Sequence, residues 1–130
     1  MKILVGYDGS NAAKNALNLA KKHALAFGAA VIVVYSMKKD SQTTPGNIEE
    51  AQKLLEYTKQ FFSIDTIPVE THLLVRGFTP GEDLVEFAQE RQVEEIVVGL
   101  KKTSPVGKMV FGSNARYVIL NARCPVVTVK

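Results

Sequence analysis

The stretch EIVVGLKKTSPVGKMVFGSNARYVILNA, residues Glu95 to Ala122, decides the fold class, because it joins a buried strand to a helix through a long loop. The β-branched run Ile96 to Val98 ends at Gly99, which is typical of a central strand in a parallel sheet. Gly112 and Ser113 directly precede apolar residues at helical spacing, and Ser113 is the predicted N-cap. The stretch therefore predicts strand, loop and helix in that order.

The start of this helix is suited to binding an anion. A helix N-terminus leaves several backbone N–H groups unpaired and carries the positive end of the helix dipole. Lys101, Lys102 and Lys108 add positive charge to the preceding loop. The pattern indicates a nucleotide phosphate site, although a Gly-Ser pair also turns and caps helices that bind nothing.

Length, composition and charge favour one soluble cytoplasmic domain spanning residues 1–130. The chain is 46% hydrophobic, which suffices for a core. The net charge of +3 is spread among interspersed Lys and Glu, so nucleic acid is not the expected partner. Cys124 is the only cysteine, which excludes an internal disulfide and predicts a buried thiol. No apolar run approaches the ~20 residues of a membrane span, and no signal peptide is expected.

Apolar strand-like runs alternate with helical patterns along the chain. The predicted strands are Lys2–Tyr7, Val31–Tyr35, Val69–Val75, Ile96–Val98 and Val126–Val129. The predicted helices run from Ser10 to Phe27, from a cap at Asn47, from a capping box at Thr79 and from Ser113. The polar stretch Ser36 to Asn47 is predicted to be a surface loop. This alternation predicts an α/β fold, a doubly wound five-stranded parallel sheet with helices on both faces.

The topology also predicts where a ligand would lie. In doubly wound sheets, ligands bind beyond the carboxyl ends of the strands, where the winding reverses. The first and fourth strands end at Asp8 and Gly99. If these strands are neighbours, Asp8 and the helix start at Gly112 and Ser113 bound one pocket.

Four features of the chain resemble the universal stress protein family. They are the opening KILVGYDGS, the segment RGFTPGEDLVEFAQE before EIVVG, the loop from Gly99 to Ser113, and the closing CPVVTV. The resemblance implies a Rossmann-like sheet of strand order 3-2-1-4-5 and a stress-linked regulatory role. It also implies a homodimer in which Val126 to Val129 pairs antiparallel with the same strand of its partner, which would cover an apolar edge.

The nucleotide-binding members of this family carry a signature of glycine, two residues, glycine, nine residues, glycine, and serine or threonine. Gly99, Gly112 and Ser113 match its first, third and last positions, whereas Lys102 replaces the second glycine. A lysine there would either hold a phosphate or occupy the pocket. The implied ligand is ATP or a related adenine nucleotide, accompanied or not by Mg²⁺.

The resemblance also implies a role for each site residue that matches the family. Asp8 would contact the adenosine portion, while Tyr7 and Ser36 would border the base. Val98 and Gly99 would lie along the ribose and phosphates. Backbone N–H groups of Gly112, Ser113 and Asn114 would bind the phosphates.

Other functions have weaker support in the sequence. His23 and His72 lack partners at metal spacing, and no serine lies in a nucleophile motif, so neither a metal site nor a catalytic residue is predicted. Without a visible general base, at most slow ATP hydrolysis is expected. A second hypothesis is a dimeric interaction module that binds client proteins and retains no nucleotide, as Lys102 would favour. A phosphoacceptor domain built on Asp8 would need further carboxylates.

Overall fold

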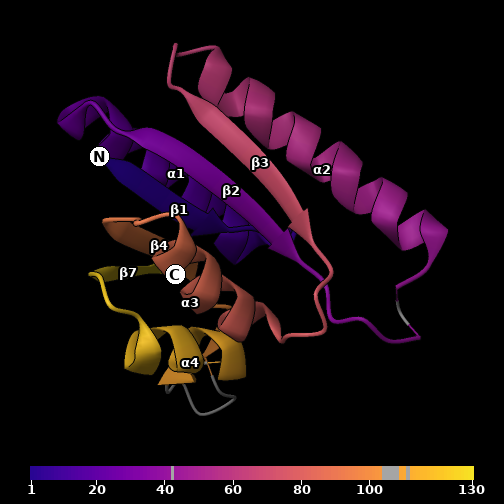
Figure 1. The fold of residues 1–130 in the computed structure, drawn as a ribbon. Helices are drawn as coiled ribbons and strands as arrows, with labels where there is room; N and C mark the ends of the chain where they lie inside the picture. Colours follow the sequence, from indigo (N-terminus) through magenta and orange to yellow (C-terminus); the bar gives the residue numbers. More distant parts are fainter. Residues whose placement is uncertain (42, 104–108, 111) are drawn as a thin grey trace.

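Five parallel strands form the central sheet of the computed structural model, which describes residues 1–41, 43–103, 109–110 and 112–130 (Figure 1). The strands are β1 (Lys2–Gly6), β2 (Ala30–Ser36), β3 (Val69–Leu74), β4 (Glu95–Gly99) and β7 (Val126–Val129). They lie in the order β3-β2-β1-β4-β7, and each neighbouring pair is parallel. The predicted order 3-2-1-4-5 is therefore confirmed. The winding reverses between β1 and β4.

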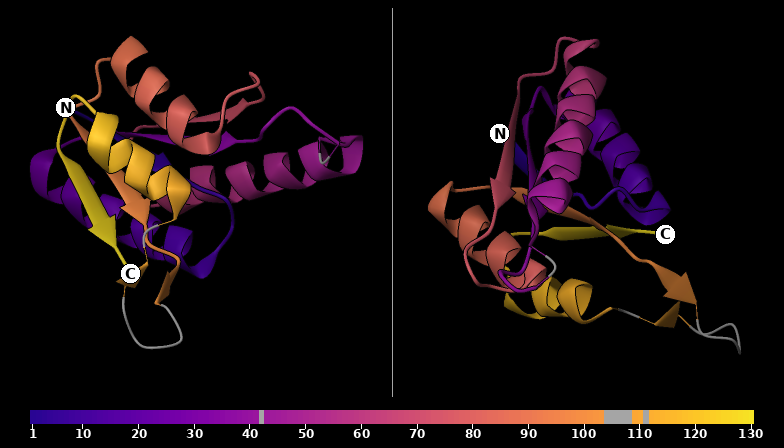
Figure 2. Two further views of the ribbon diagram at one scale, coloured as in Figure 1. Left: turned by 90° about the horizontal axis from the view of Figure 1, so that it is seen from below. Right: turned by 90° about the vertical axis from the view of Figure 1, so that its right-hand side faces the viewer.

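Two helices cover each face of the sheet (Figure 2). One face is covered by α1 (Asn11–Phe27) and α2 (Pro45–Ser63), the other by α3 (Pro80–Glu90) and α4 (Ser113–Asn121). The first core layer includes Leu17, Leu55 and Phe62, and the second includes Leu84, Phe87 and Val118. No helix in the described part of the chain is both long and apolar enough to cross a membrane.

Two predicted helix starts were wrong by a few residues. The N-cap of α2 is Thr44, whose hydroxyl accepts from the Asn47 N–H at 3.1 Å, and not Asn47 itself. Thr44 is favoured over Asn47 as the N-cap because Pro45 follows it, and the φ angle of proline is already fixed at the value that the first helical position needs. The predicted loop therefore ends at Thr44. The N-cap of α4 is Gly112 and not Ser113, because the backbone is still extended at Gly112.

Other local predictions are confirmed. Ser10 caps α1, and its hydroxyl accepts from the Ala13 N–H. Thr79 and Glu82 form the predicted capping box of α3, with each side chain bonded to the backbone of the other residue. The capping box of α3 and the side-chain caps of α1 and α2 thus fix where these three helices begin.

One element inside the segment from Leu100 to Phe111 was not predicted. β5 (Lys102–Thr103) pairs antiparallel with β6 (Met109–Val110), so part of the expected loop is a short two-stranded sheet. Each strand has only two residues, which is too short for a recognisable alternation in the sequence.

Candidate functional site

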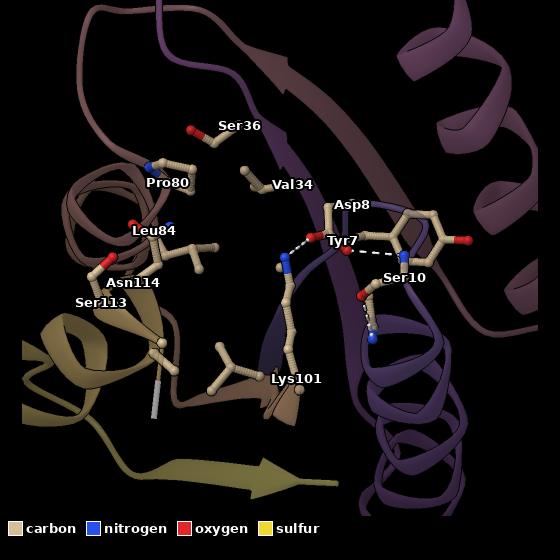
Figure 3. Close-up of a pocket in the computed structure, with 16 residues that line it drawn as sticks. Tyr7, Asp8, Ser10, Val34, Ser36, Pro80, Leu84, Lys101, Ser113 and Asn114 are labelled. Atoms are coloured by element: carbon tan, nitrogen blue, oxygen red, sulfur yellow. Dashed lines mark hydrogen bonds and ion pairs between the residues drawn. The ribbon is translucent and has the colours of Figure 1, made fainter. Parts of the chain in front are cut away.

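A pocket of about 250 Å³ opens at the carboxyl ends of β1 and β4, where the winding of the sheet reverses (Figure 3). Asp8, the second residue after β1, lies on one side, and the first turn of α4 lies on the other. Its lining is Gly6, Tyr7, Asp8, Ser10, Ala13, Val34, Ser36, Pro80, Leu84, Val98, Gly99, Lys101, Gly112, Ser113, Asn114 and Ala115. The prediction that Asp8 and the α4 start bound one pocket is confirmed.

Asp8 is held by its own turn and by a lysine. Its Oδ1 accepts from the Ser10 N–H at 3.0 Å, and Gly9 between them has a φ of +81°, a conformation that glycine adopts readily. Its Oδ2 pairs with the Lys101 ammonium, which points at it across the pocket (Figure 3). Burial alone would raise the pKa of Asp8, but the bonds from Lys101 and Ser10 outweigh it and lower this pKa below its usual value. Asp8 is therefore an anion with one oxygen committed to its turn.

The first turn of α4 is open as far as the described residues go. Helical hydrogen bonding starts with Arg116 N–H donating to the Gly112 carbonyl at 2.9 Å, and no described side chain caps the preceding N–H groups. An added Cβ at Gly112 would meet none of the described atoms within 4 Å. Within the described part of the chain, the N–H groups of Ser113, Asn114 and Ala115 are thus the unpaired donors of this helix end, beside the pocket.

The position of α4 relative to α3 depends on Asn114. Its Oδ1 accepts from the Gly81 N–H at 2.9 Å. An added Cβ at Gly81 would lie 2.9 Å from the Asn114 carbonyl oxygen, so glycine permits the close approach of the two helices. The Asn114 side-chain oxygen therefore positions the helix start.

Gly99 serves packing as well as lining the pocket. A Cβ at this position would lie 2.4 Å from the Ala12 carbonyl oxygen in the first turn of α1. Real Cβ atoms do not approach backbone this closely, so only glycine lets α1 sit against the end of β4. The glycine that matches the first position of the signature is thus required by the fold itself.

A buried carboxylate supports the Ser36 side of the pocket. The side chain of Asp83, in the first turn of α3, is 0% exposed. Its Oδ1 accepts from Arg76 Nε at 2.9 Å, and its Oδ2 accepts from the Ser36 hydroxyl at 2.5 Å. The sequence analysis missed this link, because three residues from three different elements carry no common spacing.

The predicted site residues, except Lys102, all line the pocket. The ring of Tyr7 points away from Lys101 and Ser113 (Figure 3), and its hydroxyl is the one buried side-chain polar atom without a partner among the described residues. Burial raises the pKa of Tyr7. The backbone of Lys102 lies in β5, but its side chain and the whole of Lys108 lie outside the described residues, so their predicted phosphate contacts are untested.

Several lining residues were absent from the predicted site. They are Gly6, Ser10, Ala13, Val34, Pro80, Leu84, Lys101 and Ala115. The sequence did mark Lys101 as a candidate, because it belongs to the lysine-rich loop, but it did not indicate which of these lysines faces Asp8. The apolar residues have ordinary core patterns and offer no such signal.

The other titratable side chains that the structure describes are absent from the pocket lining. His23 Nδ1 lies 2.7 Å from Oε1 of the buried Glu95, and His72 Nε2 lies 3.1 Å from Glu70 Oε2. Among the described residues, no group of three or more His, Cys, Asp or Glu side chains is arranged to hold a metal ion. Cys124 is only partly buried, contrary to the prediction, and burial raises the pKa of its thiol.

Comparison with known proteins gives the same family over the whole chain. The model of the universal stress protein family matches residues 1–130. A universal stress protein of Archaeoglobus fulgidus has a solved structure with a TM-score of 0.90 and 40% identity, covering 100% of this chain and 98% of that one. A second structure, of the universal stress protein from Archaeoglobus fulgidus in complex with dAMP, has a TM-score of 0.85 and 36% identity, and it covers the same shares of the two chains. A curated universal stress protein of Thermus aquaticus is 32% identical over 98% of this chain and 97% of its own length.

Proposed function

The chain belongs to the universal stress protein family, and from this membership and its pocket we propose that it binds ATP or a related adenine nucleotide. One observation carries the proposal. The uncapped first turn of α4 and Asp8 line the same pocket, at the carboxyl ends of β1 and β4. The 36% identical relative in complex with dAMP supports adenine as the base.

In this proposal the phosphate lies at the first turn of α4. The N–H groups of Ser113, Asn114 and Ala115 donate to its oxygens, and the helix dipole favours its charge. Gly112 leaves the room for this approach, because no atom of the described residues lies within 4 Å of the position of an added Cβ. The Lys101 ammonium lies close enough to the same space to add positive charge.

The nucleoside occupies the rest of the pocket. Asp8, which is ionised and acceptor-only, binds a ribose hydroxyl, while Val98 and Gly99 form the floor under the sugar. The base is assigned to the side of the pocket where Ser36 lies, with the phosphate at Ser113 (both residues are labelled in Figure 3). Mg²⁺ would accompany a polyphosphate through the phosphate oxygens and water, as it commonly does. Efficient turnover is not part of the proposal, because no general base is placed beside the α4 start among the described residues.

The protein acts in this proposal as a cytoplasmic regulator linked to stress, with residues 1–130 as one nucleotide-binding unit. Two copies pair through the exposed edge of β7. A bound nucleotide stabilises the native state by mass action and changes the surface that client proteins meet.

The test is to purify the chain without added nucleotide, denature it, and identify any released small molecule by chromatography and mass spectrometry. The expected result is stoichiometric AMP, ADP or ATP, or, for an empty protein, a rise in Tm with millimolar AMP or Mg-ATP. An empty protein with no such rise would contradict the proposal.

One observation favours the alternative of an interaction module without nucleotide. The Lys101 ammonium pairs with Asp8, so the carboxylate already has a partner within the protein. In that case the dimer would bind client proteins without any nucleotide. A protein that is purified empty and shows no rise in Tm with nucleotide would be consistent with this alternative.

A further inference from the structure

The Ser36 hydroxyl sits at the end of a fixed chain of hydrogen bonds. Asp83 joins Arg76, after β3, to Ser36, the last residue of β2, with distances of 2.9 and 2.5 Å. Arg76 is held from a second side by Glu90, whose carboxylate oxygens both lie 3.4 Å from Nη1. Ser36 also lines the pocket, so the chain ends at the ligand space.

The chemistry of the three groups fixes the direction of every bond. A guanidinium group only donates, and an ionised carboxylate only accepts. Burial alone would lower the pKa of Arg76, but Asp83 and Glu90 outweigh it and raise this pKa, so the guanidinium stays charged. Asp83 lies in the first turn of α3, and its two oxygens are the acceptors in both bonds, Oδ1 from the Arg76 guanidinium and Oδ2 from Ser36. The Ser36 hydroxyl therefore donates to Asp83.

A serine hydroxyl has a single hydrogen, and this one is already used. Toward the pocket Ser36 presents only the lone pairs of its oxygen, because its proton lies on the bond to Asp83. A ligand group that donates a hydrogen bond is satisfied there. A ligand carbonyl in the same place would bring two acceptors together and leave both unpaired.

We infer that the chain Arg76–Asp83–Ser36 makes Ser36 an acceptor that selects a base with an exocyclic amino group over one with a carbonyl at that position. The inference rests on the proposed nucleotide site, in which the phosphate lies at α4 and the base toward Ser36. Ser36 is then a specificity-determining residue, while Asp83 and Arg76 are positioning residues that act through it.

The experiment compares AMP with IMP, which carries a carbonyl in place of the 6-amino group, by calorimetric titration of the full chain. For the unmodified protein, AMP should bind about ten-fold more tightly than IMP. Ser36→Ala should reduce this ratio to within about two-fold, since the selecting oxygen is gone. Ser36→Thr keeps the hydroxyl and should retain the preference.

Asp83→Asn tests the direction of the bonds. The amide oxygen can still accept from Arg76, while the amide nitrogen donates to the Ser36 oxygen and frees the hydroxyl proton for the ligand. The AMP preference should then disappear or invert toward IMP. Ser113→Ala is the matched control, because Ser113 lies at the α4 start and its loss should change both affinities by the same factor.

The outcomes separate this inference from the proposed function. If AMP and IMP bind the unmodified protein equally, or if Ser36→Ala keeps the full preference, the inference is wrong while nucleotide binding stands. If Ser36→Ala abolishes the preference but Asp83→Asn leaves it intact, the directing role of Asp83 is overturned. If no nucleotide binds at all, both fall. Thermal unfolding of each ligand-free variant establishes that it is folded.

Discussion

The ammonium of Lys101 pairs with Oδ2 of Asp8 across the pocket, so the turn after β1 is joined to the loop that follows β4. The side chains are 61% and 39% exposed, which places the pair at the mouth of the pocket and in contact with solvent. Such a pair contributes only about 0–1 kcal/mol, so a phosphate can draw the lysine away at small cost.

Replacing Lys101 should weaken nucleotide binding. Lys101→Met keeps the length of the side chain but removes the charge that the proposal brings to the phosphate. The expected loss in AMP affinity is about three- to ten-fold, and the salt dependence of binding should fall with it. Calorimetry at two salt concentrations measures both effects. Tighter binding would instead mean that the lysine blocks Asp8.

The charge of Asp8 should contribute to stability only above acidic pH. Its pKa is lowered in the folded protein, so its contribution is present above the unfolded value near 3.9 and is lost as the pH falls through the folded value. Asp8→Asn keeps the oxygen that accepts from Ser10 but removes the charge. Urea unfolding should give a deficit of at most about 1 kcal/mol at pH 7, closing below pH ~4. A deficit that stays constant with pH would contradict this.

Gly99 and Gly112 should respond differently to alanine. Gly99→Ala places a Cβ 2.4 Å from the Ala12 carbonyl oxygen and should cost at least about 2 kcal/mol of the free energy of unfolding. The Cβ of Gly112→Ala meets no atom of the described residues and should change stability by less than about 1 kcal/mol, yet it should weaken AMP binding by crowding the phosphate. Chemical denaturation and titration of both variants test the contrast, and equal stabilities would refute it.

Asn114 should matter to folding through its side-chain oxygen. Asn114→Ala leaves the Gly81 N–H unpaired, at an expected cost of about 1–2 kcal/mol. Asn114→Asp restores the acceptor and should recover most of that stability, but its negative charge beside the α4 start should weaken AMP binding. Recovery of stability without loss of affinity would argue that the phosphate lies elsewhere.

The proposed dimer predicts a specific effect at β7. Ile96 N–H donates to the Pro125 carbonyl and Leu100 N–H to the Val129 carbonyl, so these alternate residues face β4. The backbone of Thr128 therefore faces the open edge, and Thr128→Pro removes a donor there without breaking the bonds to β4. The proline variant should sediment as a monomer and Thr128→Ala as a dimer. A proline variant that remains dimeric would place the interface elsewhere.

The fold was predictable because each strand and helix carries its own local pattern. The continuous β-branched runs, the capping box at Thr79 and the cap at Ser10 all agree with the observed elements. Errors occurred where two starts competed, as at Thr44 and Asn47, or where elements were too short for a pattern, as in β5 and β6. The strand order came from resemblance, since alternation alone does not order a sheet.

The site was predictable where it follows from topology and not where it depends on side-chain geometry. Asp8 and Gly112 end up together because the sheet reverses its winding between β1 and β4. The burial of Asp83 and its bond to Ser36 join residues 47 positions apart, and a helix-start acid normally looks like a solvent-exposed charge that favours the dipole. Nor does the sequence indicate that Lys101, among the neighbouring lysines, would face Asp8.

The most direct test of the central claim is an NMR titration of the ¹⁵N-labelled chain with AMP. Binding in the proposed pocket should shift the backbone amides of Asp8, Gly9, Ser113 and Asn114 together, with one saturation curve and one nucleotide per chain. The amides of α2, which contributes nothing to the pocket lining, serve as the internal control and should stay in place. No shift at millimolar AMP, or shifts confined to residues outside the pocket, would contradict the claim that this pocket binds an adenine nucleotide.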